Sequence, residues 1–205
     1  MPHLEKKTKP ILAVFDFDGT LTKHDSFVPF LRFAFGNITF ALKMISLAAP
    51  SLLYLCKSLT RDALKEKLIA TFLTGVKQSW LQDQANAFYE AQWDKLMRPA
   101  AIPGVAAELN SGAEVTLCSA SPALVLQPFA QRLGVKLIAT ELEVTAAGVL
   151  TGKINGYNCR RANKIKRLQA IYGDLTKYHL RAWGDSQGDT ELLAAAQDKH
   201  WQPFR

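Results

Sequence analysis

The feature that most constrains this chain is a short apolar run, residues 11–15, that ends directly in Asp16, Asp18 and Gly19. In an extended strand, residues i and i+2 face the same side, so both carboxylates point together until Gly19 turns the chain. Two like charges this close are costly unless a cation lies between them, and carboxylate oxygens suit Mg²⁺. The alternative is an ordinary Asp-Gly turn. The pattern predicts a strand ending in a reactive site, with one carboxylate as nucleophile and the other transferring protons.

Two later apolar runs also end in polar side chains. Residues 115–118 lead into Ser119, whose hydroxyl and following amides, at the start of a helix, can cradle a phosphoryl group. Residues 180–184 lead into Asp185 and, four residues on, Asp189. Taken singly, these three residues are just as typical of helix N-caps. Because the carboxyl ends of parallel strands form one edge of a sheet, we expect the three side chains to meet Asp16 there.

A lysine completes the set of candidate site residues. Lys164 lies in a basic stretch, residues 159–167, where it would neutralise charge on a nucleophile and on a transferring phosphoryl group. A lysine in a basic helix is usually solvated, and neighbouring Lys166 is the competing assignment.

The string Asp16-Phe17-Asp18-Gly19-Thr20-Leu21-Thr22 resembles the first motif of the haloacid dehalogenase (HAD) superfamily of phosphohydrolases. Ser119, Lys164 and residues 184–189 are similar to the second, third and fourth motifs, in the same order. Four motifs in the right order are far more specific than any one of them. The resemblance also favours a phosphatase over a dehalogenase, because enzymes of the dehalogenase branch generally lack the second aspartate.

The resemblance implies a magnesium-dependent reaction in two steps. Asp16 attacks phosphorus and becomes an aspartyl phosphate, while Asp18 protonates the leaving group and then activates water. Lys164 is the third catalytic residue. The implied Mg²⁺ ligands are Asp16, Asp185 and the main-chain carbonyl of Asp18, with Asp189 as a further ligand or the residue that orients Asp185. The implied substrate contacts are Ser119, Ala120, Thr20 and Asp25.

Periodicity divides the chain into two kinds of structure. Strand and helix signals alternate after residue 100, as a parallel sheet with crossover helices requires. The preceding part is helical, and HAD proteins of one subclass insert a helical cap at this place. The chain is therefore predicted to be α/β, with a Rossmann-like HAD core of parallel sheet over residues 1–22 and 99–205 and a small α-helical cap over residues 23–98. Trp80, Phe88 and Trp93 are expected in the core of the cap.

Residues 38–56 are the most ambiguous segment. They are mostly apolar, with Lys43 and Pro50 as the main interruptions, and are long enough for a transmembrane helix. A simple span would put Asp16 and Ser119 on opposite sides of a membrane, although both must meet in one site. The remaining interpretations are a buried cap helix, which we favour, a hairpin dipping into the bilayer, and an interfacial helix broken at Pro50.

Composition indicates the setting of the protein. Of 205 residues, 25 are basic and 18 acidic, a net charge of +7 that would attract anionic lipid headgroups or a phosphorylated substrate. No nucleic-acid motif accompanies this charge, so nucleic acid is not an expected partner. Cys56, Cys118 and Cys159 show no paired spacing and read as reduced thiols. With no signal peptide visible, we expect a cytoplasmic protein, with the inner face of the membrane as the alternative location.

Within the superfamily, the chain most resembles the subclass that contains phosphoserine phosphatase. Asp25 stands where those enzymes usually carry Glu, and only Arg61 and Lys67 are candidates for their cap arginine. A second branch, phosphatidylglycerophosphatase C and its relatives, is similar in the apolar cap segment and in Cys159, five residues before Lys164. The expected substrate is a small or lipid phosphate monoester, phosphatidylglycerophosphate-like or phosphoserine-like. Alternatives are a catalytically weak module that binds a membrane or a partner, and a phosphotransferase.

Overall fold

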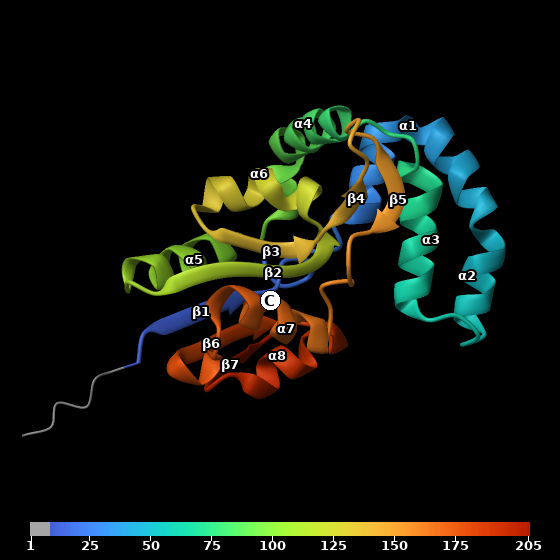
Figure 1. The fold of residues 1–205 in the computed structure, drawn as a ribbon. Helices are drawn as coiled ribbons and strands as arrows, with labels where there is room; N and C mark the ends of the chain where they lie inside the picture. Colours follow the sequence, from blue (N-terminus) through green and yellow to red (C-terminus); the bar gives the residue numbers. More distant parts are fainter. Residues whose placement is uncertain (1–8) are drawn as a thin grey trace, which may run out of the picture.

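The computed structural model describes residues 9–205, so residues 1–8 of the predicted core lie outside the described residues. Its centre is a five-stranded parallel sheet in the order β3-β2-β1-β6-β7 (Figure 1). The predicted α/β fold class is confirmed. The strands are β1 (Ile11–Phe15), β2 (Glu114–Pro122), β3 (Lys136–Thr140), β6 (His179–Gly184) and β7 (Asp198–Trp201).

Helices cover both faces of the sheet. Strand β1 reads as a continuous apolar run because it is buried on both sides, as central parallel strands are. Ala13 and Phe15 pack in the core beneath α5 and α6, whereas Leu12 and Val14 pack on the side of α7 and α8 (Figure 1). These helices are α5 (Ala101–Asn110), α6 (Ala123–Leu133), α7 (Ala162–Tyr172) and α8 (Thr190–Ala195), with the short 3₁₀ turns η1 (Leu175–Lys177) and η2 (Gln187–Asp189) beside them.

Four of the five helices between β1 and β2 in the chain form the cap. The two connections between cap and core run side by side: Thr22 and Met97 form an antiparallel bridge, and the Arg98 amide donates to the Leu21 carbonyl at 2.8 Å. The cap therefore sits on a paired neck above the carboxyl end of β1. Its helices are α1 (Phe27–Ser46), α2 (Ala48–Leu55), α3 (Arg61–Leu73) and α4 (Gln78–Leu96).

A hairpin from the second half of the chain joins the cap. It consists of β4 (Leu142–Val144) and β5 (Leu150–Ile154), and Figure 1 shows it beside α3. The Gly75 amide donates to the Leu150 carbonyl at 2.9 Å, and the Leu150 amide donates to the Val76 carbonyl at 2.8 Å. Residues that the sequence assigned to the core thus extend the cap.

The favoured prediction of a buried helix over residues 38–56 is wrong. The segment forms the end of α1 and all of α2, with a break at Leu47, and most of its large apolar side chains are exposed. By length and composition α1 could cross a membrane, yet Gly36, at φ 75° and ψ 163°, interrupts its helical backbone. Apolar composition does not specify which face of a helix is covered, and here α3 covers only one side.

The remaining expectations for secondary structure and packing are largely met. Phe88 and Trp93 are buried in the cap, whereas Trp80 is 36% exposed at its surface.

Gly152 offers a test of how the hairpin joins the cap. It has φ +79°, and a Cβ there would lie 2.0 Å from Thr74 Oγ1 and 3.1 Å from the Ala70 Cα. We expect Gly152→Ala to lower the free energy of unfolding by about 2–4 kcal/mol, through left-handed strain and overpacking. The matched control is Gly148→Ala, at φ +74° with open space around it, which should cost only about 1–2 kcal/mol. Equal losses in denaturant unfolding would contradict the packing argument.

Candidate active site

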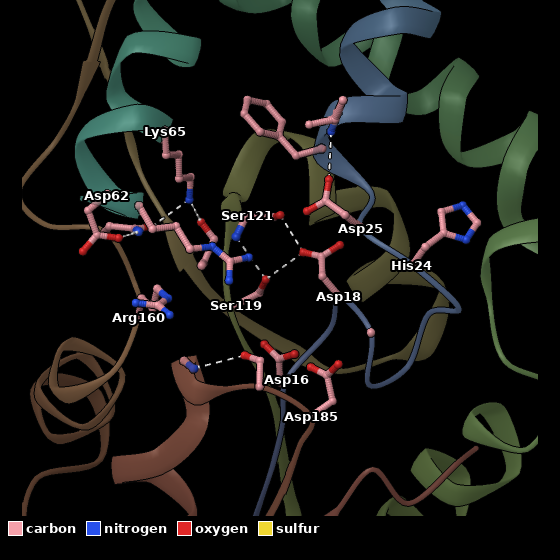
Figure 2. A pocket seen from close by; sticks show the side chains of 18 of the residues that line it. Asp16, Asp18, His24, Asp25, Asp62, Lys65, Ser119, Ser121, Arg160 and Asp185 are labelled. Atoms are coloured by element: carbon pink, nitrogen blue, oxygen red, sulfur yellow. Dashed lines mark hydrogen bonds between the residues drawn. The ribbon is translucent and has the colours of Figure 1, made fainter. Parts of the chain in front are cut away.

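The predicted site residues converge on one cavity of about 540 Å³ at the carboxyl ends of β1, β2 and β6 (Figure 2). This is where open parallel sheets bind ligands. From the first half of the chain come Asp16, Asp18 and Asp25; from the second half come Ser119, Ala120, Lys164, Asp185 and Asp189. Among the residues predicted to be catalytic, to bind substrate or to bind metal, only Thr20 does not line it.

Lys164 lies at the centre of the site. Its ammonium donates to Asp16 Oδ1 and to Asp189 Oδ1, both at 2.6 Å, and its side chain is 1% exposed. Burial alone would lower the pKa of Lys164, but the two carboxylates outweigh burial and hold that pKa well above its ordinary value. Lys166 is exposed, so the geometry brings Lys164, and not its neighbour, into the site.

Asp16 is a buried carboxylate at the end of β1. Burial raises its pKa to about 7, with Asp189 and Asp18 adding to the rise and Lys164 opposing it. The Thr20 hydroxyl donates to Asp16 Oδ2 at 3.1 Å, so Thr20 orients this carboxylate from behind instead of facing the cavity. A further cation beside Asp16 would lower its pKa again and favour the ionised carboxylate.

The acidic cluster fits a hard cation. Asp16, Asp185 and Asp189 can each offer one oxygen, and these oxygens lie within 4.8 Å of one another. In the described part of the chain, Asp185 Oδ1 is a buried atom with no hydrogen-bond partner, while Asp185 Oδ2 accepts from Arg205 at 2.9 Å. Burial and the neighbouring Asp189 raise the pKa of Asp185. A divalent cation would satisfy both the orphaned oxygen and the crowded negative charge.

Asp189 has a different environment from Asp185. Its Oδ1 binds Lys164, and its Oδ2 accepts from the Asp185 amide at 3.3 Å and from the Ser186 amide and hydroxyl at 3.1 Å. Of the two roles predicted for Asp189, the geometry favours orientation of the Asp185 loop. Gly19 allows this loop to come close, because at φ +81° a Cβ would lie 2.2 Å from Asp185 Oδ2.

Asp18 is held by three hydrogen-bond donors around its carboxylate. Ser121 donates through its hydroxyl to Oδ2 at 2.6 Å, and Ser119 does so at 3.4 Å. The Ser26 amide donates to Oδ1 at 2.7 Å. Burial, followed by the charge of Asp25, nevertheless raises the pKa of Asp18. A carboxyl with a raised pKa can hold a proton to deliver to a leaving group.

Ser119 differs from its expected setting. The sequence places it at a helix start, but β2 continues through Pro122 and α6 begins only at Ala123. Pro122 still pairs with β3 after an irregularity in register, and this keeps the chain extended. The Ser121 amide donates to Ser119 Oγ at 3.1 Å. Sequence reasoning missed Ser121 because it ended the strand at Cys118; in the longer strand, Ser119 and Ser121 are two residues apart and share a face, and both donate to Asp18.

A second missed group descends from α3 of the cap (Figure 2). Lys65 donates to the Ala120 carbonyl and, at 2.7 Å, to Asn158 Oδ1. Asn158 in turn donates to Asp62 Oδ1 at 2.7 Å, which ties cap to core. Burial lowers the pKa of Lys65 to about 8. Arg61, one of the two cap candidates, also lines the cavity.

Lys67, the other cap candidate, is not among the cavity residues. The signal for the correct face was the four-residue spacing of Arg61 and Lys65, which places both on one side of a helix. Arg160 adds a third basic side chain to this part of the cavity.

The cap wall also has an apolar part. Asp25 also lines the cavity at this end and accepts from the Val28 amide at 3.0 Å, so it stabilises the start of α1. The cavity therefore combines an acidic floor, a basic side and an apolar wall. The wall residues are Phe27, Val28, Met44, Leu47, Leu64 and Leu68.

Two of the cysteines meet behind the site. Cys118 Sγ and Cys159 Sγ lie 3.7 Å apart, both buried and both free thiols. Their separation of 41 residues hid this proximity. Burial raises the pKa of Cys118, whereas a hydrogen bond from Cys118 lowers the pKa of Cys159.

Comparisons with known proteins agree with this geometry. Residues 13–194 match the haloacid dehalogenase-like hydrolase family. The protein CicA of Caulobacter vibrioides is 36% identical over 199 residues, 96% of this chain and 88% of CicA. A protein of unknown function from Bordetella pertussis has a TM-score of 0.77 at 25% identity, with 92% of this chain and 87% of that chain covered.

A phosphoserine phosphohydrolase-like protein from Francisella tularensis has a TM-score of 0.64 at 19% identity, with 93% of this chain and 85% of that chain covered. This second structural likeness is one of fold. The expected resemblance to the HAD superfamily, and in fold to phosphoserine phosphatase-like proteins, is confirmed.

The central ion pairs give a prediction for stability. Lys164→Met leaves Asp16 and Asp189 buried without their cation, so in the absence of divalent ions we expect a loss of about 3–5 kcal/mol in the free energy of unfolding. Lys166→Met, on the exposed side of the same helix, should change it by no more than about 0.5 kcal/mol. Denaturant titrations of both variants measure the difference, and a similar loss in each would show that the buried ammonium has no special structural role.

Proposed function

We propose that this chain, which belongs to the haloacid dehalogenase-like hydrolase family, hydrolyses phosphate monoesters through a covalent intermediate on Asp16. The observation that carries the proposal is the pairing of two carboxylates with different tasks. Asp16 is held by a buried ammonium at 2.6 Å, which favours its ionised, nucleophilic form. Asp18, two residues on, has a raised pKa and hydroxyl partners that suit it to carry a proton.

The two residues divide the reaction into two displacements. In the first, a carboxylate oxygen of Asp16 bonds to phosphorus, the bond from phosphorus to the leaving oxygen breaks, and Asp18 gives its proton to that oxygen. In the second, Asp18 takes a proton from water as the water oxygen bonds to phosphorus, and the bond to Asp16 breaks to release phosphate. Lys164 neutralises charge on Asp16 and on the transferring group throughout.

We further propose that the acidic cluster holds Mg²⁺. Asp16, Asp185 and the main-chain carbonyl of Asp18 would be ligands, and Asp189 would keep Asp185 in place or add a ligand. Bound there, the ion supplies positive charge to the phosphoryl oxygens. The unpartnered, buried Asp185 Oδ1 is the strongest support for this assignment.

The cavity supports an amphiphilic substrate. Its basic side, formed by Arg61, Lys65 and Arg160, suits a second anionic group near the phosphate monoester. Its apolar cap wall suits the start of an acyl or similar tail. A lipid phosphate monoester, phosphatidylglycerophosphate-like in having a second anion, uses all three parts of the cavity. Phosphoserine would leave the apolar wall uncovered.

The test is phosphate release from soluble and lipid phosphate monoesters, with and without Mg²⁺. We expect activity that is lost on chelation and restored by Mg²⁺, preference for the lipid monoester, and no detectable turnover by Asp16→Asn. Asp18→Asn should lower kcat by about 10²–10⁴-fold, the usual contribution of a general acid and base.

Asp83→Asn, which alters an exposed carboxylate on α4, is the matched control and should keep full activity. Mass spectrometry of the quenched enzyme should find phosphate on Asp16. If no substrate gives Mg²⁺-dependent phosphate release, or if Asp16→Asn does not abolish that release, the alternative of a catalytically weak binding module is favoured. Transfer of phosphate to an added alcohol in place of water would instead indicate a phosphotransferase.

Lys65 gives a prediction for pH dependence. With a pKa of about 8, it is charged below that pH and neutral above it, in a setting of Asp18, Asp62, Asp25 and Cys159. We expect KM for a substrate with a second anion to rise several-fold between about pH 7 and 9, because the ammonium that attracts this anion loses its charge.

Lys65→Arg should abolish this rise in KM, since a guanidinium stays protonated over the range. Lys65→Met should give a high KM at every pH. A rise in KM that persists unchanged in Lys65→Arg would assign the titration to another group.

A further inference from the structure

We propose that the outer face of α1 and α2 docks on an anionic lipid bilayer. We call this face the outer ridge, formed by Ile38, Leu42, Ile45, Leu52 and Leu55. Figure 1 shows both helices along the side of the cap, with α2 at the edge farthest from the sheet.

The spacing of these residues gives an exposed apolar row on each of two consecutive helices. Ile38, Leu42 and Ile45 recur at i, i+4 and i+7 on α1, and they are 79%, 64% and 70% exposed. Leu52 and Leu55 continue the pattern on α2 at 61% and 74%. Single exposed apolar residues are ordinary on a protein surface, but a row along two consecutive helices marks an interaction site.

Charge indicates which occupant suits the ridge. Residues 26–61 contain no Asp or Glu, whereas they contain Arg32, Lys43, Lys57 and Arg61. Lys43 turns away from the ridge and donates to the Thr71 carbonyl at 2.6 Å, which leaves the apolar row unbroken. Lys57 is exposed just beyond α2. Anionic headgroups attract such a surface.

A second copy of this chain is the less suitable occupant. Two such faces brought together would place like charges side by side, with no acidic residue in either segment to offset them. A bilayer buries the same apolar row and supplies the missing negative charge.

The ridge and the catalytic cavity share the same helices. The cavity is lined by Met44 on α1, by Leu47 at the break between the helices and by Ser51 on α2. Docking would therefore hold the apolar wall of the cavity next to the lipid surface. The use of this arrangement to collect a lipid substrate rests on the proposed function, whereas docking itself does not.

The experiment is flotation of the full chain with vesicles of phosphatidylcholine alone or of equal parts phosphatidylcholine and phosphatidylglycerol. We expect binding to the anionic vesicles, weakened by salt. Leu42→Ser, Leu52→Ser and Leu55→Ser combined should reduce the partition coefficient at least about tenfold. Lys57→Glu should reduce it several-fold on anionic vesicles only.

The matched control is Ile171→Ser, which removes an exposed apolar side chain from α7 and should bind as the unaltered protein does. Hydrolysis of p-nitrophenyl phosphate, a soluble substrate, reports the active site separately and should be unchanged in the triple variant. Failure of this hydrolysis in the unaltered protein would count against the proposed function and leave the vesicle result intact.

Three results would overturn the docking proposal. The first is no binding of the unaltered protein to anionic vesicles. The second is equal binding by the triple variant and the Ile171→Ser control. The third is a dimer in light scattering that the triple variant dissociates, because the ridge would then be an interface between copies.

Discussion

A single buried ammonium group holds the site together. Lys164 contacts Asp16, 148 residues earlier, and Asp189, 25 residues later, at 2.6 Å each. At this depth neither the cation nor the anions can be left alone, because an unpaired buried charge is far costlier than the set of three. The two ion pairs therefore fix the relative positions of the end of β1, the start of α7 and the turn η2. Together with burial, that arrangement sets the pKa of Asp16.

The influence of this interaction extends through Asp189 to the loop after β6. The second oxygen of Asp189 binds the amides of Asp185 and Ser186, so the ammonium indirectly sets where Asp185 lies. Glycine makes the close packing possible: a Cβ on Gly184 would lie 2.6 Å from the Cβ of Asp189. The acidic cluster is thus positioned both by the ion pairs of Lys164 and by glycines that leave room for the aspartate side chains.

The sequence predicts the core well because each motif residue stands at the end of an apolar strand, and strand ends of a parallel sheet must meet. It does not predict contacts between separate elements. Lys65 reaches Asn158, 93 positions later in the chain, across the boundary of cap and core. Ser121 meets Asp18 because β2 continues through Pro122, where the sequence predicts the start of a helix. The predicted burial of residues 38–56 is wrong because apolar composition indicates a tendency to be buried but does not identify a neighbouring element that would cover the segment.

The central place of β1 in the sheet has a consequence for how the chain folds. Its neighbours β2 and β6 begin at Glu114 and His179. Strand β1 is synthesised first, but it can pair with β6 only when nearly the whole chain has been made. Pairings of such sequence separation close slowly, whereas the cap helices form from local contacts. During synthesis the chain therefore carries Asp16 well before Lys164, which neutralises it, has been made, and the site is complete only at the last stage of folding.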